Sequence, residues 1–187
     1  MYNDANIKYI VNWKVIKSTY PFESPWLRIR MDHIRMPSGL EIPDFYVEEL
    51  PDWVNVIAIT KDGKFLVEEQ YRHGLGRVCF ELCAGAVEQG ESPLDAIKRE
   101  LIEETGYISN EWSVFGEYAP NTSGCNNLCY TFIATNVEKI SEPKLDKTEE
   151  IKLHLLNEDE IKEMMLDGRI TEAVMLAPLW RYFANKD

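Results

Sequence analysis

The stretch over residues 85–107, GAVEQGESPLDAIKRELIEETGY, constrains the fold of this 187-residue chain more than any other. Ser92 is a favoured N-cap residue, and Pro93 follows it at the helical position that tolerates proline best. Gly106 provides the expected helix end, because glycine enters the left-handed conformation without a Cβ penalty. Between these marks an apolar stripe repeats at helical spacing, formed by Leu94, Ile97 and Leu101. The pattern predicts a short helix that packs one face on a core.

Three glutamates lie close together on this predicted helix. Glu100, Glu103 and Glu104 are spaced i, i+3 and i+4, so they gather on one side of it. Like charges one helical turn apart repel each other by a few tenths of a kcal/mol, so a helix that keeps them suggests a bound cation. Hard oxygen ligands suit Mg²⁺ or Mn²⁺, with positions left for water and substrate phosphate. A solvated acidic helix face is the alternative interpretation.

The whole pattern around these glutamates has fixed spacing. Gly85 is followed after five residues by Glu91, and after seven more by the run RELIEETG from Arg99, with the hydrophobic Tyr107 next. This resembles the Nudix box at every fixed position, and aromatic Tyr107 in place of an aliphatic residue is a mild departure. The resemblance implies the Nudix fold, an α+β architecture in which helices sandwich a mixed sheet. It also implies hydrolysis of a diphosphate that links a nucleoside to another moiety.

The resemblance assigns roles to the residues of the box. It implies that Glu100 and Glu104 are metal ligands, and that Glu103 shares a metal or polarises its water. The carbonyl group of Ala84 is a further candidate ligand. Arg99 is implied to orient the glutamates, since Arg99 and Glu103 are i, i+4 neighbours, although an ordinary surface ion pair is the alternative.

The segments before the box narrow the expected substrate. EQYR at residues 69–72 and ELCAG at residues 81–85 resemble two elements of the ADP-ribose pyrophosphatase subgroup, with Cys83 in place of the usual proline. We therefore predict cleavage of ADP-ribose or a related nucleoside diphosphate sugar. Beyond the box, Pro120 opens the unusual loop PNTSGCNN, which departs from the subgroup pattern. GDP-sugars and UDP-sugars consequently stay open as substrates.

Four residues are candidates for substrate binding through the same resemblance. Arg72 resembles a phosphate-contacting arginine, and Glu81 opens the segment that leads into the box. Trp26 resembles an aromatic residue that stacks on the adenine, and Phe45 is a candidate for the opposite face of that base. The alternatives are a solvated edge arginine and ordinary core aromatics.

Carboxylates that hold a metal are poor proton acceptors, so another group should activate the attacking water. The resembled subgroup takes this group from a mobile loop downstream of the box, and the matching stretch is KLDKTEE at residues 144–150. Glu149 is the first candidate for the general base, Glu150 the second and Asp146 the third. A solvated acidic loop is the alternative.

Extended segments before the box predict an antiparallel β extension over residues 1–50, which precedes a hydrolase domain over residues 51–187. We expect strands of the extension near residues 6–17, 26–35 and 44–49. Such strands rarely form a stable body alone, so they should pack on the core or on a partner chain. The resemblance implies a homodimer with Trp26 near the partner.

The end of the chain carries two helix signals. Asn157 and Glu160 have the spacing of a capping box, and the helix that they open should stop at Gly168. Thr171 is the expected cap of a final helix, in which Pro178 either introduces a kink or lies in the first turn.

Composition limits the class of protein. A net charge of −12 argues against general binding of nucleic acid, which needs a basic surface. The absence of a long apolar run and of a signal-peptide pattern predicts a soluble, cytoplasmic protein. The four cysteines form two C-x3-C pairs, and with only three histidines this spacing predicts reduced thiols and no zinc site.

Other functions stay open as alternatives. A hydrolase of nucleoside triphosphates would usually be shorter and lack the N-terminal strands, and an RNA-decapping enzyme should bring a basic groove. An ADP-ribose sensor without catalysis would carry an added DNA-binding domain and often a degraded box.

Overall fold

The computed structural model describes residues 11–25 and 27–185, and its contacts divide the chain into two units. The first unit contains the described residues up to Leu50 together with residues 121–126. The second unit contains residues 51–120 and the described residues from Asn127 onward.

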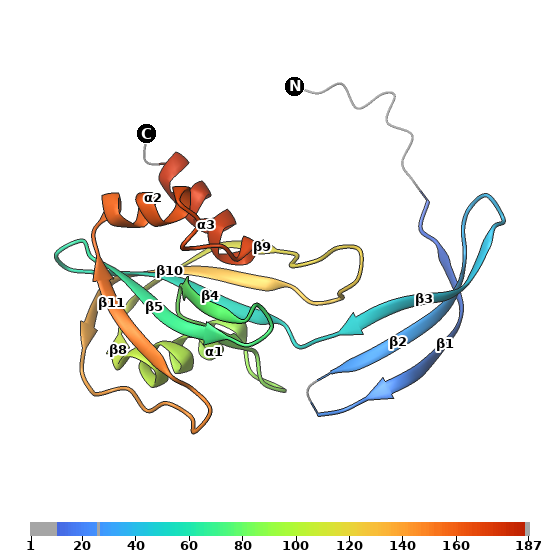
Figure 1. Ribbon diagram of the computed structural model, residues 1–187, viewed down its shortest axis with the longest axis horizontal. Helices are drawn as coiled ribbons and strands as arrows, with labels where there is room; N and C mark the ends of the chain where they lie inside the picture. The colour runs from blue at the N-terminus through green and yellow to red at the C-terminus, as the bar shows by residue number, and fades with distance from the viewer. Residues whose placement is uncertain (1–10, 26, 186–187) are drawn as a thin grey trace. The chain divides into compact units, whose positions relative to one another are not determined.

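The first unit is built on a three-stranded antiparallel sheet in the order β1-β2-β3 (Figure 1). Its strands are β1 (Lys14–Glu23), β2 (Arg28–Arg35) and β3 (Glu41–Glu49). The expected antiparallel extension is therefore present. Its first strand ends at Glu23 and not at residue 17 as expected, and residues 6–10 of the expected strand lie outside the described residues. Strand β1 continues through Pro21, which lies at a register shift of this edge strand, where a missing N–H is tolerated.

Residues 121–126 join this sheet through backbone hydrogen bonds to β3. The Glu48 N–H donates to the Gly124 carbonyl at 2.7 Å, and the Asn126 N–H donates to the Glu48 carbonyl at 3.3 Å. The polar loop singled out in the sequence thus belongs to the first unit.

The second unit is an eight-stranded mixed sheet with the main order β11-β5-β4-β10-β8. Strand β10 pairs with β4 in parallel, whereas its pairs with β8 and β9 are antiparallel. Strand β6 pairs with β5, and β7 pairs with β4. The strands are β4 (Trp53–Thr60), β5 (Phe65–Arg72), β6 (Arg77–Glu81), β7 (Ala84–Ala86), β8 (Tyr107–Ile108), β9 (Glu111–Tyr118), β10 (Cys129–Lys139) and β11 (Ile151–Leu156).

Helices cover both faces of this sheet, as Figure 1 shows with α1 on one side and α2 and α3 on the other. The helices are α1 (Pro93–Glu100), α2 (Glu158–Leu166) and α3 (Ala173–Ala184). Alternate residues of β4 point to opposite faces. Val54 and Val56 pack in one buried cluster with Ile97 of α1, and Ile57 packs in another with Leu179 of α3. The predicted α/β/α sandwich with a mixed sheet is confirmed.

Local signals in the box place its helix. The Asp95 N–H donates to the Ser92 hydroxyl at 3.2 Å, and Gly106 ends the helix with φ of +74°. The interpretation as one regular helix is wrong in its last turn, because the α-helix stops at Glu100 and residues Leu101–Thr105 form a π-helical turn. The Thr105 hydroxyl donates a hydrogen bond to the Leu101 carbonyl at 2.5 Å, and this bond competes with the regular backbone hydrogen bond to the same carbonyl.

The two C-terminal helices begin differently. The capping box of α2 is confirmed, since Asn157 and Glu160 exchange side-chain-to-backbone hydrogen bonds of 2.6 and 2.9 Å. The expected Thr171 cap is wrong, because α3 begins at Ala173. Pro178 lies inside α3, and the Val174 carbonyl four residues before it accepts a hydrogen bond from Asn55 Nδ2 at 2.9 Å. That contact satisfies the backbone acceptor that proline leaves free.

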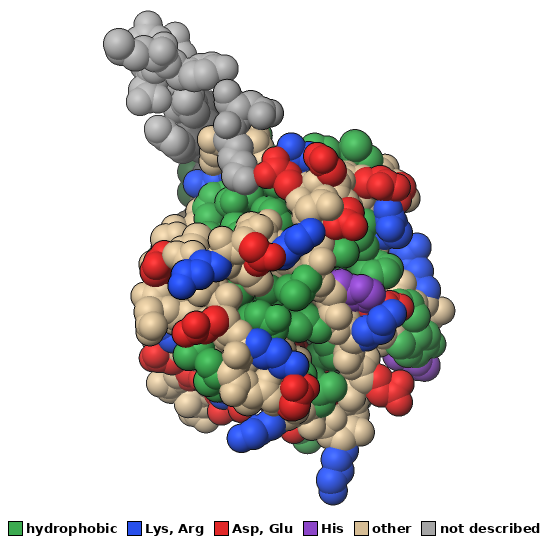
Figure 2. All heavy atoms as spheres, turned by 90° about the vertical axis from the view of Figure 1, so that its left-hand side faces the viewer, with side chains coloured by type: hydrophobic (Ala, Val, Ile, Leu, Met, Phe, Trp, Pro, Cys, Tyr) green, Lys and Arg blue, Asp and Glu red, His purple; other side chains and the backbone are tan. Residues whose placement is uncertain are grey.

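One face of the molecule shows how its surface charges are distributed. In Figure 2 acidic and basic side chains alternate with hydrophobic ones, and neither sign forms a continuous area on this face. Among the described residues, no helix has the length and hydrophobicity needed to cross a membrane.

Candidate functional site

Strand β7 and helix α1 approach each other closely at Gly85. A Cβ atom on Gly85 would lie 2.0 Å from Glu100 Oε1, so only glycine leaves room for this carboxylate. The sequence places Glu100 at the last position of α1 and Ala84 next to Gly85 on β7. The close approach therefore brings the Glu100 carboxylate against the backbone that contains the predicted Ala84 ligand.

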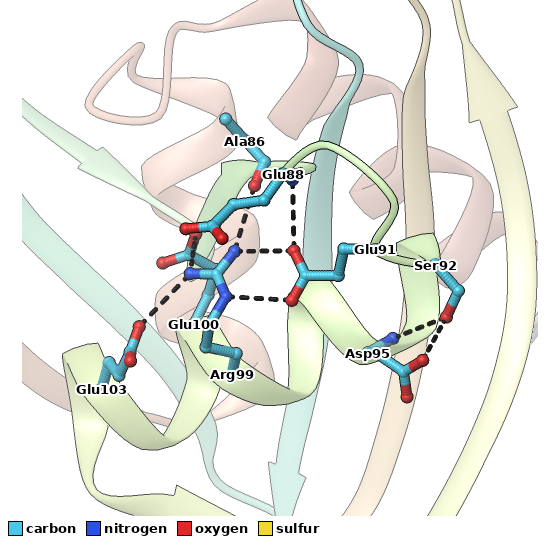
Figure 3. Close-up of polar contacts among 8 residues, drawn as sticks. All are labelled: Ala86, Glu88, Glu91, Ser92, Asp95, Arg99, Glu100 and Glu103. Carbon is cyan, nitrogen blue, oxygen red and sulfur yellow. Dashed lines mark hydrogen bonds and ion pairs between the residues drawn. The ribbon is translucent and has the colours of Figure 1, made fainter.

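Arg99 is the centre of a group that we call the outer network, formed with Glu91 and Glu103 (Figure 3). Its Nε and Nη2 atoms each donate at 3.0 Å to the Glu91 carboxylate, a bidentate pairing. Its Nη1 atom donates to Glu100 Oε1 at 2.8 Å and to Glu103 Oε2 at 3.3 Å. Nη2 also donates to the Ala86 carbonyl at 3.2 Å. Arg99 thus holds two box glutamates and the preceding loop in place.

A second group, the inner cluster, is formed by Glu68, Cys83 and Glu104. The three residues are 4%, 1% and 8% exposed, and their ligand-forming atoms all lie within 4.8 Å of one another. Cys83 Sγ donates to Glu104 Oε2 at 3.2 Å. Glu68 Oε1 has no hydrogen-bond partner among the residues that the structure describes.

Burial changes the proton affinity of the inner cluster. It raises the pKa of Glu104 to about 7, and the negative charges of Glu100 and Glu149 act in the same direction. The pKa of Glu68 also lies well above its usual value, because of burial first and of the Glu104 and Glu81 charges next. Burial raises the pKa of Glu100 as well. A carboxyl group without a cation favours its neutral form in such surroundings.

These donors fit a divalent cation. Mg²⁺ and Mn²⁺ prefer hard oxygen ligands, and Glu68, Glu100 and Glu104 offer carboxylate oxygens of this kind. One of them, the buried Glu68 Oε1, has no hydrogen-bond partner in the described part of the chain. Glu103 differs from them, because its side chain is 46% exposed and directed to Arg99.

The predicted base loop runs beside the π-helical turn. The Lys144 N–H donates to the Glu103 carbonyl at 2.7 Å. Glu149 is held by the Asp146 N–H, which donates to its carboxylate at 2.9 Å. Burial is the main cause of the raised pKa of Glu100 and Glu104, and the negative charge of Glu149 acts in the same direction on both. Glu150 is exposed in the same loop.

Arg72 and Glu81, both predicted to bind substrate, form a pair across β5 and β6. Arg72 Nε donates to both carboxylate oxygens of Glu81 at 2.9 Å, and Nη2 contacts the same carboxylate. Glu81 is buried, whereas the Arg72 side chain is 46% exposed. Glu81 lies directly opposite Glu68 in the register of β5 and β6, so the Arg72–Glu81 pair adjoins the inner cluster.

Of the two aromatic candidates, Phe45 belongs to the first unit. Phe45 packs edge-on against Trp13 with ring centroids 6.3 Å apart. Both rings line a pocket of about 350 Å³ together with Val47 and residues 122–125. Trp26 lies outside the described residues, and Trp13 was not singled out in the sequence.

Glu68 was also missed in the sequence, although its position carried a signal. Residues of β5 alternate between faces, so Glu68 shares the face of Leu66, which packs in the cluster that contains α1. A carboxylate two residues beyond a core leucine points toward the helix that carries the box glutamates.

Comparisons with known proteins agree with this geometry. A family model described as NUDIX domain matches residues 50–176, and one described as nucleoside diphosphate sugar hydrolase N-terminal domain matches residues 13–47. A methanol dehydrogenase activator from Bacillus methanolicus is 30% identical over 86% of each chain. An ADP-ribose pyrophosphatase from Bacillus subtilis is 27% identical over 81% of this chain and 76% of the relative.

An ADP-ribose pyrophosphatase from Mycobacterium tuberculosis is likewise 27% identical, over 80% of this chain and 72% of the relative. Among solved structures, an ADP compounds hydrolase superimposes with a TM-score of 0.82 over 96% of this chain and 98% of that chain. At 17% sequence identity, this likeness concerns the fold alone.

Proposed function

This chain belongs to the Nudix hydrolase family, and on that premise we propose that it cleaves the diphosphate of ADP-ribose or a related nucleoside diphosphate sugar. The products are a nucleoside monophosphate and a sugar phosphate, and the reaction depends on Mg²⁺ or Mn²⁺. The observation that carries the proposal is the position of two box carboxylates against the segment at residues 83–85: Glu104 Oε2 accepts a hydrogen bond from Cys83 Sγ at 3.2 Å, and a Cβ on Gly85 would lie 2.0 Å from Glu100 Oε1.

The carboxylates divide between holding a cation and moving a proton. Glu100 and Glu104 would hold the metal, with Glu68, Glu103 and the Ala84 carbonyl as further ligand candidates. When bound, the metal polarises phosphoryl oxygens and lowers the pKa of a coordinated water.

Glu149 is a separate carboxylate on the loop, and it accepts the proton of the attacking water at a carboxylate oxygen. Glu150 is the next candidate for this role. Arg99 holds the Glu100 carboxylate in one orientation through its Nη1 contact at 2.8 Å. Arg99 is therefore a positioning residue in this account.

Arg72 and Glu81 act together in substrate binding. A guanidinium binds phosphate oxygens through several donors, and the bidentate contact with buried Glu81 fixes the plane of the Arg72 fork. Positive charge on the side of the inner cluster suits the diphosphate of the substrate.

Features of the first unit favour a sugar nucleotide over a nucleoside triphosphate as the substrate. Residues 13–47 match the N-terminal domain model of nucleoside diphosphate sugar hydrolases. Phe45 and Trp13 supply aromatic surface on which a base can stack. We assign residues 1–50 to base contacts and to assembly of a homodimer, because β1 leaves several apolar side chains exposed, among them Val15, Ile16, Tyr20 and Phe22.

A substrate panel tests the proposal. The protein is incubated with Mg²⁺ or Mn²⁺ and, in separate reactions, ADP-ribose, NADH, GDP-mannose, UDP-glucose, diadenosine polyphosphates and deoxynucleoside triphosphates, and the products are identified by ³¹P NMR. We expect ADP-ribose to yield AMP and ribose 5-phosphate. A clear preference for nucleoside triphosphates with release of pyrophosphate would contradict the proposal.

A further inference from the structure

The inner cluster contains a sulfur atom that the proposed hydrolysis does not use. Cys83 stands between β6 and β7 at the position where the resembled subgroup usually has proline, so the thiol is a feature of this chain. We propose that Glu68, Cys83 and Glu104 form a binding site for a thiophilic divalent cation such as Zn²⁺ or Co²⁺, with the Cys83 sulfur as a ligand.

The ligand atoms of the inner cluster lie close enough together to share an ion. The two carboxylates and the sulfur all lie within 4.8 Å of one another. A Zn²⁺ ion binds oxygen at about 2.0–2.2 Å and sulfur at about 2.3 Å, so two of its ligand atoms lie at most about 4.5 Å apart. The cluster therefore needs only a small contraction of side chains to share one ion.

Glu68 has a buried carboxylate oxygen that could bind an ion. Its side chain is 4% exposed, and Oε1 has no hydrogen-bond partner within the described part of the chain. The Cys83 thiol carries a single hydrogen, which it donates to Glu104 at 3.2 Å, so the thiol cannot satisfy both acids at once. A buried carboxyl oxygen without a hydrogen bond destabilises the folded state, and a shared cation would remove that cost.

The donor set combines one sulfur with two carboxylates, which selects among divalent cations. Sulfur is a soft ligand and favours Zn²⁺ or Co²⁺, whereas Mg²⁺ prefers oxygen ligands only. The thiol loses its proton to solvent as the sulfur–metal bond forms, and no oxidation or reduction takes place. The spacing of cysteines and histidines predicted no zinc site. That spacing could not reveal this cluster, because two of its three ligands are glutamates and Glu68 comes from a distant strand.

Cobalt binding tests the proposal directly. Co²⁺ is titrated into the full-length, metal-free protein, and the thiolate-to-cobalt charge-transfer band in the near ultraviolet is recorded. We expect a band that saturates at one ion per chain, survives excess Mg²⁺ and disappears when Zn²⁺ is added. We expect no band in Cys83→Ser or Cys83→Ala, and an affinity at least about 10-fold lower in Glu68→Gln.

Two control variants test whether thiols outside the proposed site produce the band. Cys79→Ser removes a different buried thiol, and Cys125→Ser removes a partly exposed one, so both variants should keep the band. The absence of a band in the wild-type protein, or its persistence in a folded Cys83 variant, would overturn the proposal. So would its loss in Cys79→Ser or Cys125→Ser with folding intact. If neither Cys83 variant folds, unchanged Co²⁺ affinity in Glu68→Gln would overturn it. This readout needs no turnover, so its failure leaves the proposed hydrolysis as it stands.

Discussion

The outer network and the inner cluster both gather glutamates in the second unit, but their charges are balanced in different ways. Glu91 and Glu103 share the Arg99 guanidinium, and this contact lowers the pKa of Glu91. Among the described residues, Glu68 and Glu104 form no ion pair, and burial raises the pKa of both. The chain supplies the cation of the outer network itself. The inner cluster, with Glu100 beside it, is therefore where an external cation has most to contribute.

Removal of one inner carboxylate should have the largest effect. We expect Glu104→Gln to lower turnover about 10⁴-fold at saturating Mg²⁺, because a metal ligand is lost while the shape of the side chain is kept. The metal-free variant should be at least as stable as the wild type near pH 7, since it also removes like-charge repulsion and the cost of a buried charge. Steady-state kinetics and thermal unfolding measure the two effects. Unchanged turnover would show that Glu104 is not a ligand.

Replacement of Glu149 tests whether the general base lies outside the outer network and the inner cluster. Glu149→Gln should depress turnover about 10²- to 10⁴-fold with little change in KM, the usual share of general-base catalysis. Glu150→Gln serves as the neighbouring control, and we expect it to have the smaller effect. Near-normal turnover in both variants would move the base elsewhere, with Glu103 the next candidate.

The pH dependence of stability should have opposite signs in the two groups. The pKa of Glu104 is raised from 4.5 to about 7, so the native state binds more protons than the unfolded state between these values. Stability from Glu104 is present below pH 4.5 and decreases by about 3 kcal/mol as pH rises through 7. The lowered pKa of Glu91 gives stability that is present above its usual value of 4.5 and lost at lower pH.

Denaturant unfolding of the metal-free protein from pH 4 to pH 8 measures these contributions. Glu104→Gln should flatten the loss of stability toward pH 8, and Glu91→Gln should flatten the loss toward pH 4. Added Mg²⁺ should restore stability at pH 8, because it binds the ionised carboxylates of the native state. The same loss toward pH 8 in Glu104→Gln as in the wild type would contradict the assignment.

The smallest expected effect concerns the approach of β7 to α1. Gly85→Ala should lower kcat about 10²-fold, because its Cβ displaces the Glu100 carboxylate from a position only 2.0 Å away. Gly74→Ala is a matched control, since a Cβ at Gly74 meets no atom within 4 Å. Equal kinetics of the two variants would show that the position of Glu100 does not matter.

Local chemistry in the sequence predicted much of the fold. The Ser92 cap, the Gly106 stop and the capping box of α2 follow from side chains within a few residues of each helix end. The π-helical turn was missed, because it depends on how the Thr105 hydroxyl competes for the Leu101 carbonyl. The choice between Pro178 inside α3 and Pro178 in its first turn could not be made from the sequence, because Asn55, far away in the sequence, donates to the Val174 carbonyl that the proline leaves free.

The candidate site shows the same division between local and distant information. The box glutamates and Arg99 were identifiable, because their spacing within one helix is fixed. Glu68 was not identified as a site residue, because its place in the site depends on the pairing of β5 within the sheet and on the burial of its carboxylate. The pairing of Arg72 with Glu81 likewise requires the register between β5 and β6.

Metal binding separates the inner and outer carboxylates most directly. Mn²⁺ is titrated into the metal-free wild-type protein and into Glu104→Gln and Glu103→Gln, and free Mn²⁺ is measured by electron paramagnetic resonance. We expect Glu104→Gln to weaken binding at least about 10-fold and Glu103→Gln to weaken it less. Wild-type affinity in Glu104→Gln together with lost binding in Glu103→Gln would contradict the assignment of the metal to the inner carboxylates.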